Sequence, residues 1–142
     1  IVRATGFFSE EEAEVALELA MDALALGGSS AYRFTFAEEQ DGAVAGYACF
    51  GAVPCTRGSF DIYWMAVHPD SQGSGIGAAL IKRVEDLVLA MGGERIYIET
   101  ASRALYRPTR LFYEKMGYTA EASLEDFYSR GDGKIIYVKR LR

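Results

Sequence analysis

Residues 60–91, FDIYWMAVHPDSQGSGIGAALIKRVEDLVLAM, contain the pattern around which the rest of the chain is organised. Residues 60–67 are apolar and aromatic, which predicts a strand, and residues 68–74 are polar with proline and glycine, which predicts a loop. From about Gly75 the apolar residues recur at the spacing of one helix face. A strand, a glycine-rich loop and a helix in this order bring free backbone N–H groups and the positive end of a helix dipole together. The stretch therefore predicts a phosphate-binding site.

The sequence on both sides of this stretch predicts further strands and helices. Ser9 and Glu12 form a capping box before an apolar helical pattern that ends at the glycine pair 27–28. Short turns such as Asp41-Gly42 predict antiparallel strand pairs, whereas the strand–helix–strand from residue 60 to residue 100 predicts a parallel pair. We therefore expect one mixed α/β sheet, mostly antiparallel, of about six to seven strands flanked by helices. Further strands are expected at residues 1–4, 32–37, 44–53, 95–100, 118–128 and 134–141, and a further helix between about Pro108 and Gly117.

The composition predicts a single soluble domain over residues 1–142. Half of the residues are apolar and a quarter are charged, which is enough for a core in a chain of this length. The net charge of −5 disfavours nucleic acid and anionic membranes as partners. No secretory signal or membrane-spanning segment is recognisable, so we expect a cytoplasmic protein with no nucleic-acid or membrane partner.

The few cysteine and histidine residues exclude several kinds of site. Cys49 and Cys55 are too few for a disulfide framework, and neither has a basic neighbour in the sequence that would activate its thiol. His68 is the only histidine, so a metal site or a serine triad that needs a second histidine cannot form. We expect no metal.

The glycine loop taken alone permits more than one interpretation. The letters GSGIGA at residues 73–78 satisfy the dinucleotide fingerprint G-x-G-x-x-A, and Glu99 follows at about the 20-residue interval of that fingerprint. The fingerprint requires its first glycine directly after the strand, however, and residues 68–72 intervene here. The remaining chain is also short for the parallel strands of a dinucleotide-binding fold. Glycines in this arrangement also suit a tight strand-to-helix turn that binds nothing.

Read from Gln72, the same loop is QGSGIG, and with WMAVHPD before it and an amphipathic helix after it, it resembles motif A of the GNAT family of N-acetyltransferases. Residues 111–118, LFYEKMGY, resemble the later helix of that family, whose pattern is F-Y-x-x-x-G-F or G-Y. The two blocks have the family's usual separation, with the expected strand IYIET between them. The resemblance covers nearly the whole chain.

The resemblance implies acetyl transfer from acetyl-coenzyme A, the expected co-substrate, to a primary amine of a small-molecule or peptide acceptor. Backbone N–H groups of residues 72–77 would bind the pyrophosphate, with the Ile76 side chain pointing into the core. The pantetheine arm would lie along residues 65–67, and an N–H near Met65 would stabilise the oxyanion. The cofactor-binding residues implied in this way are Met65, Ala66, Val67, Gln72, Gly73, Ser74, Gly75, Ile76 and Gly77.

Three side chains are candidates for proton transfer. Tyr113 matches the family tyrosine that hydrogen-bonds and protonates the departing sulfur, although its spacing alone also suits a packed aromatic. Asp61 stands where some family members carry a glutamate base, and Glu99, at the end of the neighbouring strand, is the second candidate base. Each carboxylate has a structural alternative, as an exposed strand residue or as a partner of an arginine such as Arg33, Arg95 or Arg103. A water chain is a further alternative for the base.

The chain also departs from the family pattern, and several alternatives stay open. Many relatives carry an asparagine and an alanine at the positions of Tyr106 and Thr109, so the cofactor contact of that asparagine is in doubt. The acceptor pocket is expected in the variable loops at residues 4–9, 54–59 and 124–133, with residues 126–128 closest to the acceptor. A silent acyl-coenzyme A sensor of the same fold, a longer-acyl transferase and an NAD-binding oxidoreductase are the alternative functions, and the oligomeric state, including a homodimer, is open.

Overall fold

The computed structural model of the chain describes residues 32–142. The strand expected at residues 1–4 and the helix expected after Ser9 lie outside these residues. Every strand and helix expected within the described part is present, with ends that agree to within a few residues. The elements are β1 (Arg33–Glu38), β2 (Val44–Ala52), β3 (Ser59–Val67), the 3₁₀ turn η2 (Pro69–Ser71), α3 (Ile76–Ala90), β4 (Arg95–Ala101), the 3₁₀ turn η3 (Ala104–Tyr106), α4 (Arg107–Lys115), β5 (Thr119–Ser129) and β6 (Asp132–Arg140).

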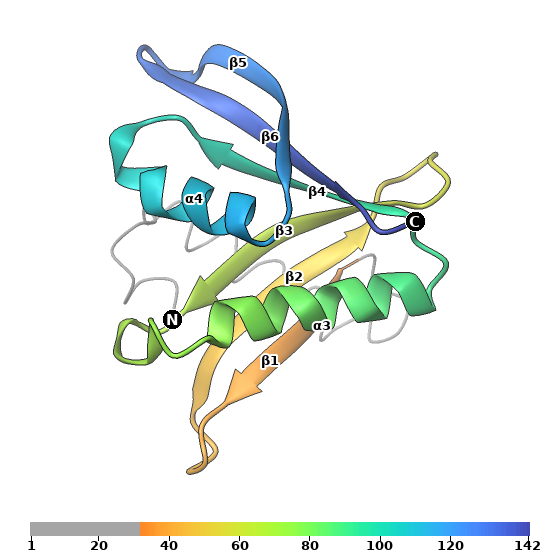
Figure 1. Cartoon of the computed structure of the whole chain (residues 1–142), viewed down its shortest axis with the longest axis vertical. Helices are drawn as coiled ribbons and strands as arrows, with labels where there is room; N and C mark the ends of the chain where they lie inside the picture. Colours follow the sequence, from red (N-terminus) through yellow and green to blue (C-terminus); the bar gives the residue numbers. More distant parts are fainter. Residues whose placement is uncertain (1–31) are drawn as a thin grey trace.

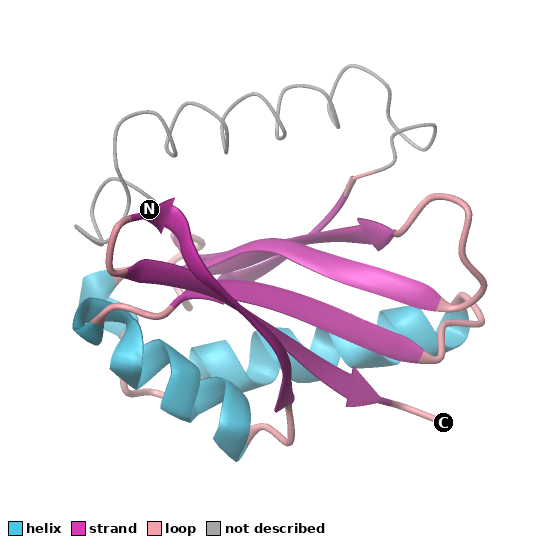
Figure 2. Cartoon of the chain, turned by 90° about the horizontal axis from the view of Figure 1, so that it is seen from above, coloured by secondary structure: helices cyan, strands magenta, loops and turns pink. Residues whose placement is uncertain are grey.

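The described strands form one sheet in the order β1-β2-β3-β4-β6-β5 (Figure 1). All neighbouring pairs are antiparallel except β3 and β4, which are parallel and are joined through α3. Both α3 and α4 lie on the same face of the sheet (Figure 2). The mixed, mostly antiparallel sheet expected from the sequence is therefore confirmed.

The core between α3 and the sheet explains why residues 60–91 organise the fold. Alternation along β3 places Phe60 and Ile62 on the face that meets α3, where both are buried in one apolar cluster with residues of α3 and β4. Gly93, just after α3, permits a close approach, because a Cβ there would overlap the Val88 side chain and lie 2.8 Å from the ring of Phe60. The α3 residues of this cluster are Ile81, Val84 and Val88, and those of β4 are Ile96 and Ile98.

Strands β3 and β4 pair over only part of their length. Their parallel register ends at Ile62, which lies opposite Ile98. In the ladder between β2 and β3, Tyr63 is an extra residue between Ile62 and Trp64, which makes it a β-bulge. A bulge bends its strand and increases the local twist. Beyond Tyr63, β3 continues along β2 while β4 continues along β6, so the two parallel strands diverge.

Candidate functional site

The first component of the candidate site is the edge of β3 beyond the bulge. Met65, Ala66 and Val67 pair with β2 on one side, and within residues 32–142 no strand pairs with them on the other. The backbone groups directed to that side have no strand partner within residues 32–142, and apart from the Val67 carbonyl, which accepts from Gln72, they suit an extended ligand that adds to a strand edge as another strand does. The residues implied for the pantetheine arm therefore lie on a backbone edge with which no strand in residues 32–142 pairs.

The glycine loop connects this edge to α3 and leaves the first N–H groups of the helix without acceptors in the helix. Gly73 and Gly75 have φ angles of 81° and 84°, in the left-handed region that favours glycine. Gly75 is the N-cap residue, and no side chain caps this end. The first intrahelical hydrogen bond joins the Ala79 N–H to the Gly75 carbonyl at 3.0 Å, so the N–H groups before Ala79 face outward. Such an end suits an anion.

Side chains within the loop hold its shape. Gln72 donates a hydrogen bond from Nε2 to the Val67 carbonyl at 3.1 Å, which ties the loop to the end of β3. The Ser74 hydroxyl donates to the Ser71 carbonyl, and the Ser71 hydroxyl donates to the Glu39 carboxylate at 2.7 Å. The Gln72 side chain is thus engaged in fixing the loop, and the Gln72 N–H donates to the Pro69 carbonyl at 3.3 Å, while the exposed backbone of residues 73–75 can contact a ligand.

Two glycines let the start of α3 approach its neighbours closely. A Cβ at Gly46 in β2 would lie 2.9 Å from the Ala66 carbonyl oxygen and 3.4 Å from the Ile76 side chain, so the partly buried Ile76 side chain lies against β2. A Cβ at Gly77 would lie 3.2 Å from Cζ of Phe112. The first turn of α3 and the helix α4 therefore lie side by side.

Tyr113 follows Phe112 and lies on the buried side of α4. Its side chain is 8% exposed, and its ring packs against the rings of Tyr118 and Tyr137, with centroid distances of 6.4 and 6.0 Å. The Tyr113 hydroxyl forms no hydrogen bond with any group in residues 32–142. Burial raises the pKa of Tyr113 to about 12, so the hydroxyl keeps its proton at neutral pH and remains a donor. The position is compatible with both interpretations of this tyrosine, as a packed aromatic and as a proton donor.

Asp61 and Glu99 lie on the same face of the sheet, opposite the face that α3 and α4 cover. Their neighbours Ile62 and Ile98 are buried in the core under α3, so alternation directs the two carboxylates to the other face. Asp61 is half-buried, and this burial and the nearby Glu99 raise its pKa, whereas Lys134 lowers it. A carboxylate with a raised pKa is better suited to accept a proton near neutral pH.

Lys134 is the member of this group that sequence reasoning missed. Its Nζ lies 2.8 Å from Oε2 of Glu99, so the partner of Glu99 is a lysine on β6 and not one of the arginines considered from the sequence. Lys134 lies opposite Ala101 in the β4–β6 register, diagonal to Glu99. The pairing register of β4 and β6, which are far apart in the sequence, leaves no local sequence pattern. The contact between Lys134 and Glu99 could therefore not be predicted from the sequence.

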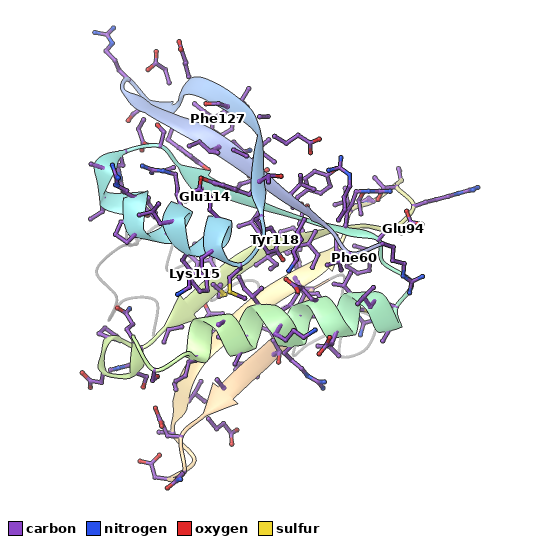
Figure 3. All side chains as sticks on the ribbon, viewed as in Figure 1. Phe60, Glu94, Glu114, Lys115, Tyr118 and Phe127 are labelled. Atoms are coloured by element: carbon purple, nitrogen blue, oxygen red, sulfur yellow. The ribbon has the colours of Figure 1, made fainter. Side chains whose placement is uncertain are left out.

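The hairpin between β5 and β6, expected near the acceptor, presents exposed aromatic side chains. Phe127 and Tyr128 are 53% and 50% exposed, and Phe127 extends from β5 near the hairpin (Figure 3). Asp126 has a positive φ of 55° and accepts a hydrogen bond from the Gly131 N–H at 2.7 Å, which fixes the turn. A polar cavity of about 170 Å³ lies beside it, lined by Ser102, Ser123, Glu125, Asp126, Gly131 and Gly133.

Other residues considered from the sequence have structural explanations. Cys49 is fully buried, and burial raises the pKa of its thiol to about 12, so it behaves as a small apolar side chain. Tyr106, at the position of the family asparagine, is the N-cap of α4. Within residues 32–142 no group of three or more His, Cys, Asp and Glu side chains could hold a metal ion. None of the helices described there is both long and apolar enough to cross a membrane.

Comparison with known proteins gives consistent matches. A family model described as the acetyltransferase (GNAT) domain matches residues 30–120. An uncharacterized N-acetyltransferase from Methanocaldococcus jannaschii is 33% identical over 118 residues, which cover 82% of this chain and 73% of that protein. The crystal structure of a GNAT-family protein from Desulfovibrio desulfuricans superposes with a TM-score of 0.96 at 48% identity and covers 99% of this chain and 88% of that chain.

A more distant structure shares the fold. An aminoglycoside 6′-N-acetyltransferase complexed with coenzyme A superposes with a TM-score of 0.73 and covers 99% of this chain and 86% of that chain. Its sequence is 19% identical, so this likeness concerns the fold alone.

Proposed function

The chain belongs to the GNAT family of acetyltransferases, and on that premise we propose that it transfers an acetyl group from acetyl-coenzyme A to a primary amine by direct attack in a ternary complex. The observation that carries this proposal is the continuity of two features. The edge at residues 65–67, with which no described strand pairs on its far side, is followed after the short turn η2 by the glycine loop at the start of α3. An extended arm with an anionic end, as in coenzyme A, fits such a surface.

The residues present fit the cofactor on physical grounds. The loop is exposed, its two left-handed glycines have no Cβ that would keep a diphosphate from the backbone, and the first N–H groups of α3 have no side-chain cap. We propose that the N–H groups of residues 72–77 bind the pyrophosphate and that the edge of β3 binds the pantetheine arm. When bound, acetyl-coenzyme A supplies a thioester whose carbonyl carbon can accept an amine.

The protein groups then have three separate roles. Asp61, or Glu99 in its place, takes a proton from the ammonium form of the acceptor, so that the nitrogen lone pair becomes available. A backbone N–H near Met65 stabilises the negative charge that develops on the carbonyl oxygen. The Tyr113 hydroxyl, which keeps its proton at neutral pH, donates to the sulfur as the carbon–sulfur bond breaks.

The direct test is release of free coenzyme A thiol from acetyl-coenzyme A in the presence of a panel of amines. We expect amine-dependent thiol release together with thermal stabilisation of the protein by acetyl-coenzyme A. Tight cofactor binding without turnover on any amine would favour the sensor, and stabilisation by NAD alone would favour the oxidoreductase. Faster transfer from propionyl- or longer acyl-coenzyme A would identify a longer-acyl transferase.

Replacing Tyr113 by phenylalanine is expected to lower kcat by about 10²-fold, at the low end of the effect of a general acid, because a thiolate is already a fair leaving group. The ring contacts with Tyr118 and Tyr137 stay in place, so the dissociation constant of acetyl-coenzyme A should change little. Steady-state kinetics and a binding titration separate the two quantities. An unchanged kcat would remove Tyr113 from the mechanism.

Replacing Gly75 by valine is expected to weaken acetyl-coenzyme A binding by more than about tenfold, because a β-branched residue disfavours the φ of 84° that turns the loop N–H groups outward. Gly92 provides a matched control, since it has a φ of 82°, lies just beyond the other end of α3, and has equal space around a Cβ. Gly92→Val should carry a similar backbone strain without loss of binding. Equal affinities of the two variants, measured by titration, would refute the assignment of the phosphate site.

A further inference from the structure

We propose that Lys134 is a positioning residue for the acetyl transfer: by pairing with Glu99 it engages that carboxylate and leaves Asp61 as the group that takes the proton from the amine. This inference rests on the proposed function, which it deepens by assigning different roles to the two candidate bases. Lys134 lies on β6, a strand for which the sequence predicted no role in the site.

The contacts of Lys134 fix its ammonium group in place. Nζ lies 2.8 Å from Oε2 of Glu99 and 4.3 Å from the ring centroid of Phe127, so a carboxylate and an aromatic face both contact the charge. The Lys134 side chain is only 14% exposed, whereas that of Glu99 is 49% exposed. Burial and these two favourable contacts hold the Lys134 side chain in one conformation. In that conformation its ammonium group keeps the Glu99 carboxylate turned toward β6.

The sheet geometry brings Asp61 into the range of the same pair. Asp61 lies opposite Tyr97 in the parallel register of β3 and β4, and Glu99 lies two residues further along β4, on the same face. The two carboxylates and the one ammonium leave this group with a net charge of about −1 when all are ionised. The remaining negative charge is that of Asp61, because Lys134 pairs with Glu99. A single negative charge suits one acceptor ammonium group.

The charged and titratable groups around Asp61 act in different directions. Burial and Glu99 on β4 raise the pKa of Asp61, and Lys134 on β6 lowers it. On β3 itself, Asp61 raises the pKa of Tyr63, whose ring contacts that of Tyr32 at 5.4 Å. Tyr63 is neutral near pH 7, so within residues 32–142 burial and Glu99, opposed by Lys134, set the direction in which the pKa of Asp61 is displaced.

The proton balance of the step follows from this arrangement. An N–H bond of the acceptor ammonium breaks, its electron pair stays on nitrogen, and an O–H bond forms on Asp61. Lys134 keeps Glu99 from sharing that proton, because its ammonium group occupies the Glu99 carboxylate at 2.8 Å. Without Lys134 the two carboxylates would compete for one proton, as like charges at a shared site do.

The test is the pH dependence of kcat/KM in Lys134→Met, which keeps the length and apolar stem of the side chain and removes its charge. Loss of the positive charge should raise the pKa of Asp61 further, so the acidic limb of the profile should move to higher pH and the rate at a fixed pH on that limb should fall severalfold. Lys134→Gln is a second neutral variant, and Lys134→Arg should restore the limb of the wild type. Arg140→Met is the control, because Arg140 also lies on β6 and pairs across strands with Glu121, away from the site.

If the role of Lys134 were purely structural, its neutral variants would lose activity or stability, but the acidic limb of their pH profile would stay at the wild-type pH. If both neutral variants keep the wild-type limb, the proposal is wrong. A carboxyl-carbon NMR titration of Asp61 provides a readout that needs no turnover, and it should show the same upward movement in Lys134→Met and Lys134→Gln. If the wild type transfers no acetyl group to any amine, the proposed function fails, and an Asp61 titration that is equal in wild type and both neutral variants overturns the role of Lys134 separately.

Discussion

Replacing Asp61 by asparagine is expected to lower kcat/KM for an amine acceptor by about 10²- to 10⁴-fold at neutral pH, the range over which a lost general base acts. Asparagine has nearly the same shape as aspartate but accepts no proton at this pH. The wild-type profile should rise with pH as Asp61 loses its proton, at a pH displaced upward because burial and Glu99 raise the pKa of this carboxyl. In Asp61→Asn that acidic limb should disappear. Steady-state rates across pH, with the acceptor varied, give the measurement.

Two comparisons make this result specific. Glu99→Gln should have the smaller effect, because Glu99 is engaged by Lys134 at 2.8 Å. Asp61→Asn should leave acetyl-coenzyme A binding and folding stability at neutral pH close to those of the wild type, since it removes a carboxylate whose charged form burial disfavours. If Asp61→Asn were fully active, or if Glu99→Gln lost more of its kcat/KM than Asp61→Asn, Asp61 would not be the base.

The parts of the structure that depend on local sequence could be predicted. The strand, loop and helix at residues 60–91 follow from apolar periodicity and from glycine and proline punctuation, and the structure has β3, η2 and α3 there. The strand β5 gave a weak pattern for a physical reason. All of its residues are exposed, so no alternation of buried and exposed positions marks it in the sequence.

The parts that depend on register between distant strands could not be predicted. The divergence of β3 from β4 follows from one extra residue, Tyr63, and a bulge of this kind has no sequence signature in an aromatic strand. The pairing of Lys134 with Glu99 depends on the β4–β6 register. Asp61 was considered as an exposed strand residue or as a base, and only the folded arrangement reveals that it is half-buried.

The contact between Glu85 and Lys139 is another such feature, and it leads to the largest expected effect on stability. Glu85 in α3 is 5% exposed, and its carboxylate accepts hydrogen bonds from Lys139 Nζ at 3.1 Å and from the Tyr118 hydroxyl at 3.1 Å. Lys139 also donates to the Met116 carbonyl at 2.9 Å. Together these groups join α3, the end of α4 and β6, and Tyr118 lies just beyond α4 (Figure 3).

Replacing Lys139 by methionine is expected to lower the free energy of unfolding by about 3–5 kcal/mol, because it leaves the Glu85 carboxylate buried without its positive partner. This is a large share of the roughly 5–15 kcal/mol that stabilises a typical domain, and urea unfolding monitored by circular dichroism measures it. Because the ring of Tyr118 packs against Tyr113, the loss should also disturb the proposed proton donor, so kcat should fall even where the variant remains folded.

The double variant Glu85→Leu with Lys139→Met separates an unpaired charge from lost packing. Apolar residues of similar size often replace a buried ion pair with little cost, so the double variant should be more stable than Lys139→Met alone. Lys82→Met, which breaks the exposed pair of Lys82 with Asp86 on the same helix, should cause no resolvable loss. If Lys139→Met were as stable as Lys82→Met, the Glu85 carboxylate would have to be stabilised by groups other than Lys139. The hydrogen bond from the Tyr118 hydroxyl at 3.1 Å would then be the remaining polar contact described for this carboxylate.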